Sequence, residues 1–246
     1  MRKMIEMVQI ELKNKNCVIT GATGGIGKEI AQILARKGCN LFLISTDNKK
    51  LFQLESKIKN LNNIKIFTFA TDLSNYENLE NVVSKIKESF DSVDIVINSA
   101  GIFYVDSLID SSIEKFEKAF NINVRAPFYL SKIFSEDMIA QNWGRIVNIG
   151  SSSSYSGFKN GSIYCTTKHA VLGLSRSLHE ELKSKNVRCY CISPASTKTE
   201  MGKISIEQNF ETFLDPIEVA ETVVFVLLFD ENLVINEIRL NRMKIE

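Results

Sequence analysis

The chain has 246 residues, 44% of them hydrophobic and 24% charged, an ordinary globular composition that can bury a core without disulfide staples. Only 3 prolines and 12 glycines exclude a collagen-like or proline-rich disordered chain. Thirty basic and 29 acidic side chains leave a formal charge of +1, which removes the usual electrostatic argument for a nucleic-acid or anionic-membrane partner.

Short apolar runs alternate with helical patterns along the chain. The runs predict strands at Cys17–Thr20, Leu41–Ser45, Ile64–Ala70, Val93–Asn98, Arg145–Gly150, Val187–Ser193 and Val234–Leu240. Between them, apolar residues near a 3.6-residue period predict helices at Ile26–Lys37, Lys49–Leu61, Asn78–Phe90, Ile113–Ile139, Ser162–Lys185 and Ile217–Phe229. Strand and helix in alternation indicate parallel strands joined by crossover helices.

The strands themselves indicate a sheet covered on both sides. The run that follows Asp94 is apolar at every position, as a strand buried on both faces requires. We therefore expect one doubly wound α/β domain over residues 1–246, with a seven-stranded parallel sheet and helices on both faces. In such sheets the ligand lies at the carboxyl ends of the strands, so we expect the functional residues in the loops that follow the strands.

The loop after the first strand is rich in glycine. Thr20–Gly27 reads TGATGGIG and opens a predicted helix. Gly21, Gly25 and Gly27 permit a tight turn and close approach of a ligand, and the free amides of a helix N-terminus favour a phosphate group. A plain tight turn is the alternative, but the strand before and the helix after favour a dinucleotide site.

The end of the second strand is expected to meet the adenosine ribose. An acidic residue there would bind the 2′-hydroxyl group and repel a 2′-phosphate. The sequence has Ser45 and Thr46 at this point, and Asp47 comes two positions late. Lys49 and Lys50 follow, within reach of a phosphate or simply as solvated lysines on a helix. These residues favour NADP(H) over NAD(H).

The ends of the third and fourth strands are expected to complete the cofactor rim. Asp72 and Leu73 follow the third strand, and Asn98, Ala100 and Gly101 belong to the segment NSAG after the fourth. The alternative for Asp72 is a structural residue near a helix N-terminus.

Tyr164 and Lys168 form the most informative pair. They are four residues apart in a predicted helix and so share one face. A free tyrosine has a pKa of about 10, so ionising it at pH 7 costs roughly 4 kcal/mol, and a nearby ammonium group reduces that cost. The pair suits reversible proton transfer to a carbonyl oxygen, although such a spacing is common in helices.

Two further polar residues are candidates for catalysis. Ser151 follows the fifth predicted strand, thirteen residues before Tyr164, but it is the first of four consecutive serines, so position alone does not select it. Asn123 lies in the predicted helix between the fourth and fifth strands. It can be a buried asparagine bonded to backbone at a helix bend, and this role does not exclude a part in catalysis.

Six segments in order resemble the motif series of the classical short-chain dehydrogenase/reductase family, over Leu12 to about Leu240: Thr20–Gly27, Asn98–Gly101, Asn123, Ser151, Tyr164 with Lys168, and Pro194–Thr199. The resemblance implies a Rossmann fold with a seven-stranded sheet that binds NAD(H) or NADP(H). It also implies that Tyr164 is the acid/base, that Lys168 lowers the tyrosine pKa and binds the nicotinamide ribose, that Ser151 orients the substrate, and that Asn123 holds a water.

The resemblance extends to a cofactor-binding set: Gly21, Thr23, Gly25, Ile26, Gly27, Ser45, Thr46, Asp72, Leu73, Asn98, Ala100, Gly101, Tyr164, Lys168, Pro194, Thr197 and Thr199. Three positions depart from the family pattern, at Ser99, Gly150 and Ala195, and none removes a catalytic group. The segment INEI at Ile235–Ile238 looks more like the branch with NADP-dependent 3-hydroxy acid and serine dehydrogenases than like typical 3-oxoacyl-acyl-carrier-protein reductases.

We therefore expect an NADP(H)-dependent oxidoreductase that acts on a small carbonyl compound or secondary alcohol, with a 3-oxoacyl-acyl-carrier-protein reductase-like enzyme as the alternative. Met201–Leu214 breaks the apolar pattern and is the expected substrate loop, at about residues 201–214. Tyr155 and Phe158 either cover the substrate or belong to the core. Two other classes are a non-catalytic dinucleotide-binding regulatory protein, which predicts a degraded catalytic set, and a methyltransferase that uses S-adenosylmethionine, which leaves that set unexplained.

The remaining expectations concern compartment and assembly. Five cysteines without a Cys-x-x-Cys pair, and only two histidines, argue against a disulfide framework and a metal site. Met1–Asn16 lacks the apolar core of a signal peptide and Val223–Phe229 is too short to span a bilayer, so we expect a cytoplasmic protein. That last helix is apolar around most of its surface, and the resemblance implies a homodimer or homotetramer.

Overall fold

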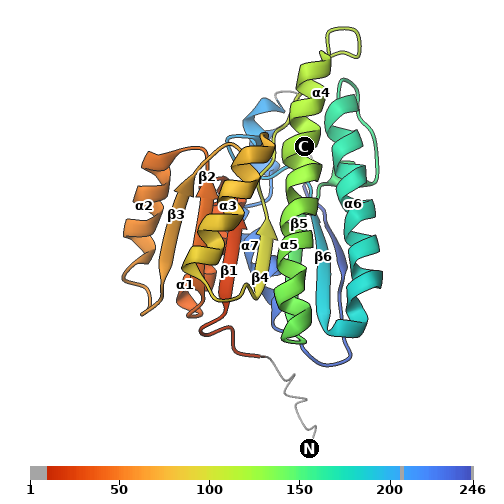
Figure 1. Ribbon diagram of the computed structural model, residues 1–246. Coiled ribbons are helices and arrows are strands. Elements are labelled where there is room, and N and C mark those ends of the chain that lie inside the picture. Colours follow the sequence, from red (N-terminus) through yellow and green to blue (C-terminus); the bar gives the residue numbers. More distant parts are fainter. Residues whose placement is uncertain (1–9, 206–207, 245–246) are drawn as a thin grey trace, which may run out of the picture.

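The computed structural model describes residues 10–205 and 208–244, and a seven-stranded sheet forms its centre (Figure 1). The strands are β1 (Asn16–Thr20), β2 (Asn40–Ser45), β3 (Ile66–Ala70), β4 (Ile95–Asn98), β5 (Gly144–Ile149), β6 (Val187–Pro194) and β7 (Glu237–Leu240). They lie in the order β3-β2-β1-β4-β5-β6-β7, and every neighbouring pair is parallel. All seven predicted strands are present, each within three residues of its expected bounds.

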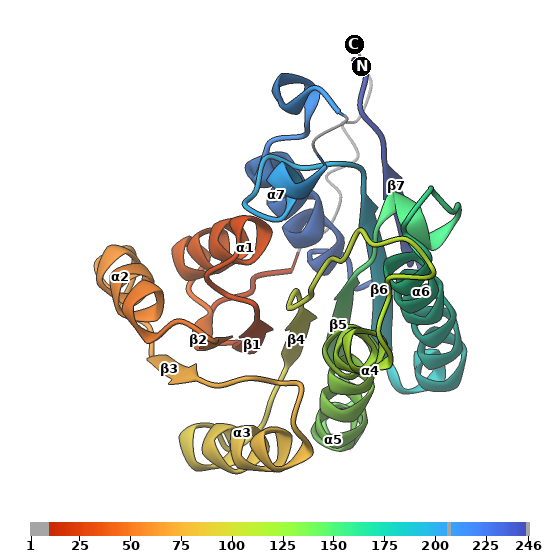
Figure 2. The same ribbon diagram turned by 90° about the horizontal axis from the view of Figure 1, so that it is seen from above.

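Helices cover both faces of the sheet, as the alternating pattern predicts. They are α1 (Gly25–Arg36), α2 (Asn48–Ile58), α3 (Tyr76–Ser89), α4 (Ile113–Phe120), α5 (Ala126–Ala140), α6 (Ser162–Leu182) and α7 (Pro216–Leu227). Figure 2 shows α1, α2 and α7 on one face and α3, α5 and α6 on the other. The fold is therefore the expected single-domain, doubly wound Rossmann fold. None of the helices among the described residues is both long and apolar enough to cross a bilayer.

Two hydrophobic layers hold the helices on the sheet, and β4 shows how one strand serves both. Ile95 and Ile97 pack in the layer beneath α1 and α7, whereas Val96 packs in the layer beneath α3 and α5, and all three are fully buried. Successive side chains of a strand point to opposite faces, so a strand between two layers must be apolar throughout. Each fully buried side chain of this kind stabilises the fold by about 1.5–3 kcal/mol.

The helix predicted over Ile113–Ile139 is not one regular helix. A π-helical turn at Asn121–Arg125 separates α4 from α5. Pro127 lies in the first turn of α5 and has no N–H group, so it cannot donate to the carbonyl oxygen of Asn123, four residues earlier. The wider turn at this point follows from that missing donor.

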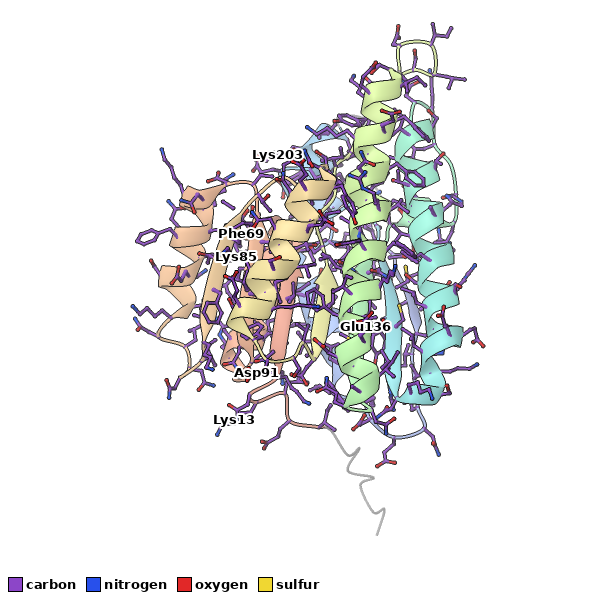
Figure 3. The ribbon with its side chains drawn as sticks, viewed as in Figure 1. Lys13, Phe69, Lys85, Asp91, Glu136 and Lys203 are labelled. Atoms are coloured by element: carbon purple, nitrogen blue, oxygen red, sulfur yellow. The ribbon has the colours of Figure 1, made fainter. Side chains whose placement is uncertain are left out.

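The carboxyl ends of the parallel strands define one edge of the molecule. In Figure 1 the strand arrows point toward this edge. Figure 3 shows Lys203, which follows β6, on that side, whereas Lys13 and Asp91, which precede β1 and β4, lie at the opposite edge. The loops that carry the predicted site residues therefore converge on one end of the sheet.

Candidate active site

A cavity of about 590 Å³ opens at the carboxyl ends of the strands, and it runs from the glycine loop to Tyr164. Most of the predicted site residues line it: Gly21, Thr23, Gly25, Ile26, Gly27, Ser45, Ala100, Gly101, Ser151, Tyr164, Lys168, Pro194, Thr197 and Thr199. Five predicted residues are not part of its lining: Thr46, Asp72, Leu73, Asn98 and Asn123. The topology thus brings together residues that are up to 178 positions apart in the sequence, from Gly21 to Thr199.

The glycine loop is folded so tightly that two of its positions have no space for a side chain. Gly21 has a φ of +64°, and a Cβ atom there would lie 2.7 Å from the Ala100 backbone; a Cβ on Gly27 would lie 2.3 Å from the Gly21 carbonyl oxygen. The N-cap Gly24 provides no side-chain cap, and the first turn of α1 holds no acidic residue. The first N–H groups of α1 and its dipole therefore fit a diphosphate.

The end of β2 presents a hydroxyl and an ammonium group rather than a carboxylate. Ser45 lines the cavity and hydrogen-bonds to the Thr23 hydroxyl. Asp47 caps α2 instead, where it accepts from the Lys50 backbone N–H at 3.0 Å, and this bond holds the pKa of the Asp47 carboxyl below its usual value. Lys50 itself lines the cavity. Asp47 is thus engaged at the helix start, and its carboxylate also lies 3.7 Å from the Lys50 ammonium group.

Ser151, Tyr164 and Lys168 meet at the other end of the cavity. All three are at most 9% exposed. The Lys168 ammonium group donates to the Ile149 carbonyl oxygen at 2.8 Å and lies 5.6 Å from the centre of the Tyr164 ring. The Ser151 hydroxyl accepts from the Ser153 backbone N–H at 3.1 Å, which fixes its orientation beside the tyrosine.

Burial governs the protonation of Tyr164 and Lys168. It raises the pKa of Tyr164 to about 12, and a hydrogen bond with the Ser151 side chain acts in the opposite direction. Burial also lowers the pKa of Lys168 to about 8. The family resemblance implies that Lys168 lowers the tyrosine pKa, but in this pocket desolvation is the larger influence on the phenol. The protein by itself therefore keeps Tyr164 protonated near neutral pH.

Asn123 lies behind the cavity, in the π-helical turn, and is 2% exposed. Its side-chain oxygen accepts from the Ile102 N–H at 2.9 Å, and its nitrogen donates to the Ile102 carbonyl at 3.0 Å and to the Thr167 hydroxyl at 3.0 Å. This arrangement matches the first sequence alternative, a buried asparagine bonded to backbone at a helix bend. Both amide hydrogens are engaged, so a water held by this residue must donate to one of its two carbonyl oxygens, that of the side chain or that of the backbone.

Other predicted rim residues support the cavity from outside. Asp72 accepts from the Ser74 N–H at 2.8 Å, which matches its structural alternative. Leu73 is buried in the hydrophobic layer beneath α3, and Asn98 donates to the side chain of Asn148 at 2.8 Å within the sheet.

The sequence did not decide whether Tyr155 and Phe158 cover the substrate or belong to the core, and the structure places the two differently. Phe158 lines the cavity and packs near Phe103, which contacts the Tyr164 ring edge-on with 4.6 Å between ring centres. Tyr155 is not in the cavity lining; its hydroxyl donates to Glu237 at 2.8 Å. The glutamate of the INEI segment therefore ties β7 to the loop after β5.

The expected substrate loop borders the cavity. Met201, Gly202, Ser205 and Gln208 contribute to its lining, and the loop is closed at its base by a bridge between Thr197 and Leu214. Residues 206–207 of this loop lie outside the described part of the chain.

Phe103 and Arg242 are among the lining residues that were not predicted as site residues. Phe103 follows the NSAG segment, and Arg242 comes two residues after the end of β7. The rule that ligands lie beyond the carboxyl ends of the strands applies to both, so their positions after β4 and β7 were the available signal.

Comparisons with known proteins agree on one family. The family model for short chain dehydrogenase matches residues 15–209. An uncharacterized oxidoreductase from Staphylococcus saprophyticus is 29% identical over 229 residues, which is 93% of this chain and 97% of that protein. A 3-oxoacyl-[acyl-carrier-protein] reductase from Aquifex aeolicus is 29% identical over 228 residues, which is 89% of this chain and 92% of that protein.

Solved structures are similar over nearly the whole chain. A metagenomic short-chain oxidoreductase in complex with NADP has a TM-score of 0.83 and 26% identity, covering 94% of this chain and 100% of that one. An alcohol dehydrogenase from Thermococcus sibiricus, complexed with 5-hydroxy-NADP, has a TM-score of 0.84 and 28% identity, covering 94% of this chain and 97% of that one.

Proposed function

The chain belongs to the short-chain dehydrogenase family, and we propose that it is an NADP(H)-dependent oxidoreductase for a small carbonyl compound or secondary alcohol, of the 3-oxo acid or 3-hydroxy acid type. One observation carries this proposal. A single cavity is lined at one end by the glycine loop at the start of α1 and at the other by Ser151, Tyr164 and Lys168. A dinucleotide and a substrate that share this cavity would meet beside the tyrosine.

The cofactor fits the residues at the loop end. The uncapped N-terminus of α1 would hold the diphosphate, and Ser45 with Lys50 would hold a 2′-phosphate. The Asp47 carboxylate caps α2 and pairs with Lys50, which partly offsets its repulsion of that phosphate. When bound, the nicotinamide supplies or accepts the hydride of the reaction.

The catalytic residues would manage the proton. In the reducing direction, the Tyr164 phenol donates its proton to the carbonyl oxygen, which the Ser151 hydroxyl also binds, and the carbonyl becomes a hydroxyl. The Lys168 ammonium group stabilises the phenolate that remains. A water on the backbone carbonyl of Asn123, which lacks its α-helical donor because of Pro127, would return a proton to this site.

Titration of the purified protein with NADPH and, separately, with NADH tests the cofactor proposal. Nicotinamide fluorescence reports binding in both cases. We expect tighter binding of NADPH, followed by oxidation of NADPH when 3-oxo acids are added. Tighter binding of NADH would contradict the roles given to Ser45 and Lys50, and binding of neither would contradict the role of the glycine loop.

A 3-oxoacyl-acyl-carrier-protein reductase remains the second candidate, favoured by the relative from Aquifex aeolicus. Thioester substrates in the same assay separate it from the first. Ser151, Tyr164 and Lys168 line the cavity together. Neither a non-catalytic regulatory protein nor a methyltransferase would give these three residues a role. Turnover of a carbonyl substrate would exclude both.

A further inference from the structure

Arg242 extends the active-site cavity beyond the residues used above. β7 pairs with β6 so that Leu240 lies beside Pro194, and the Ala195 N–H donates to the Leu240 carbonyl at 2.8 Å. Arg242, two residues later, is half-buried and lines the same cavity as Tyr164. The last strand thus places a guanidinium group in the wall of the site.

Among the described residues, the partners of this guanidinium group are all neutral. One terminal nitrogen donates to the Thr212 hydroxyl at 3.1 Å and the other to the Gln208 side-chain oxygen at 2.9 Å. The group also lies 5.1 Å from the centre of the Phe213 ring. Because a guanidinium has five N–H donors, these two bonds leave three for another acceptor.

Of the other charged side chains that line the cavity, Glu200 and Lys50 are paired, and Lys168 donates to the Ile149 carbonyl oxygen. Glu200 forms an ion pair with Lys203 at 2.6 Å, and Lys50 lies near Asp47 at 3.7 Å. Within the described part of the chain, no carboxylate lies within ion-pair distance of Arg242. A partly desolvated charge with neutral partners alone is unfavourable, and an anionic ligand removes that cost.

The position of Arg242 suits the far end of a substrate. Ser151 follows β5, Pro194 ends β6 and Arg242 follows β7, and these three strands are neighbours in the sheet. Two strand spacings separate the ends of β5 and β7, roughly 10 Å. A long arginine side chain and a substrate of a few atoms together span this distance, so a substrate with its carbonyl group beside Tyr164 can reach Arg242 with its far end.

We propose that Arg242 binds an oxyanion on the substrate, a carboxylate or a phosphate, and thereby sets the specificity of the enzyme for anionic carbonyl compounds. The planar fork of a guanidinium matches both groups. This inference rests on the proposed oxidoreductase function, since it places the reacting carbonyl beside Tyr164. The INEI segment plays no part in it, because Glu237 is bonded to Tyr155 and Arg176.

Matched substrate pairs test the inference. The first pair is 3-oxobutanoate and its methyl ester; the second is hydroxyacetone phosphate and hydroxyacetone, in which the phosphate is only a few bonds from the ketone. We expect wild-type kcat/KM to favour the charged member of one pair. Arg242→Gln should lower kcat/KM for that member about 10- to 100-fold, the usual value of a hydrogen bond to a charged group, and change the neutral member little. The pair that responds identifies the oxyanion as carboxylate or phosphate.

Thr212→Val is the matched control. It removes one partner of Arg242 in the substrate loop but keeps the guanidinium group. If Arg242 only anchors this loop, both variants will lower kcat/KM for charged and neutral substrates alike, and the inference is wrong. If Arg242 binds the oxyanion, the ratio of charged to neutral kcat/KM will fall in Arg242→Gln and stay unchanged in Thr212→Val.

A binding measurement separates this inference from the proposed function. Butanoate has no ketone to reduce, so thermal unfolding of the NADP-loaded protein reports its binding alone. We expect butanoate to raise the unfolding temperature more than butanamide does, and Arg242→Gln to abolish the difference. Wild type that binds butanoate but reduces no carbonyl compound contradicts the proposed function only. If the wild-type protein reduces ketones with the same kcat/KM for the charged and the neutral member of both pairs, only the role of Arg242 is contradicted.

Discussion

Tyr164 is buried where its phenol resists ionisation. Its pKa is raised to about 12 because burial disfavours the phenolate. Protonated tyrosine is the form that gives a proton to a carbonyl oxygen, so the protein by itself is prepared for reduction. The reverse reaction requires the phenolate, and the charges that stabilise it must come from Lys168 and from the bound cofactor.

Removal of the phenol hydroxyl tests the role of this residue. Tyr164→Phe keeps the ring and its edge-on contact with Phe103, so affinity for NADPH should be unchanged in a fluorescence titration. Turnover should fall about 10²- to 10⁴-fold, the usual contribution of a general acid. Tyr155→Phe is the matched control, because that hydroxyl bonds to Glu237 outside the cavity lining. Equal turnover in both variants would remove Tyr164 from its proposed role.

The charge of Lys168 should make cofactor affinity depend on pH. Its pKa is lowered to about 8, so the ammonium group is present below that pH and lost above it. If it bonds to the cofactor ribose, the Kd for NADPH should rise as pH increases from 7 to 9.5, by about 10-fold for a charged hydrogen bond. Fluorescence titrations at several pH values measure this directly.

Lys168→Arg provides the control for that pH dependence. Arginine stays protonated over the whole window, so its Kd should not vary with pH. The affinity itself should be weaker, because a planar guanidinium does not replace a compact ammonium group. A wild-type Kd that is constant from pH 7 to 9.5 would show that the ammonium group does not contact the cofactor.

At the scale of elements, the turn between α4 and α5 links three parts of the site. Asn123 joins this turn to Ile102, in the loop after β4, and to Thr167 of α6. Thr167 in turn donates to the Tyr164 carbonyl at 2.9 Å. One buried amide therefore holds the loop after β4 and the helix that carries both Tyr164 and Lys168.

Loss of this amide should destabilise the fold as well as the site. Asn123→Ala leaves the Ile102 N–H and carbonyl without their partner, so the free energy of unfolding should fall by about 2 kcal/mol. Urea unfolding measures the change. Asn121→Ala is the control in the same turn, because the described structure gives the Asn121 side chain no hydrogen bond. Similar stability of both variants would contradict the linking role.

The elements themselves were largely predictable. Hydrophobic periodicity located every strand because each contains a short apolar run; β4, β5 and β6 are buried throughout, whereas the edge strands β3 and β7 are only half-buried. It failed between Ile113 and Ile139, where the apolar spacing continues through a backbone change caused by Pro127. Periodicity records which side chains face the core, and that pattern survives a single π-helical turn.

The site was predictable only where motifs carry it. The glycine loop, Ser151, Tyr164 and Lys168 could be located because their spacing follows from the strand–helix order. Arg242 lacked such a pattern: its place in the cavity depends on the pairing of β6 with β7, which joins segments more than forty residues apart in the sequence. Long-range register of this kind is fixed by packing.

At the scale of the whole molecule, the apolar surface of α7 is explained mainly within one chain. Val223, Val224 and Leu227 are buried in the layer that also contains α1, so an apolar helix does not by itself require a second subunit. Other side chains remain uncovered. In α4, Ile113, Phe116 and Phe120 are 68%, 38% and 37% exposed. This apolar surface of α4 is the stronger argument for an assembly.

We expect the protein to form a homodimer or homotetramer. Covering the apolar surface of α4 with a second copy would remove the Phe116 and Phe120 rings from water, which is favourable in proportion to the area buried. Size-exclusion chromatography with light scattering should give a mass above the 27.8 kDa of one chain. Phe116→Ser with Phe120→Ser should shift the protein toward that single-chain mass, whereas Phe52→Ser, an exposed site on α2, should not. A wild type of 27.8 kDa would contradict the assembly, and an unshifted double variant would place its interface elsewhere.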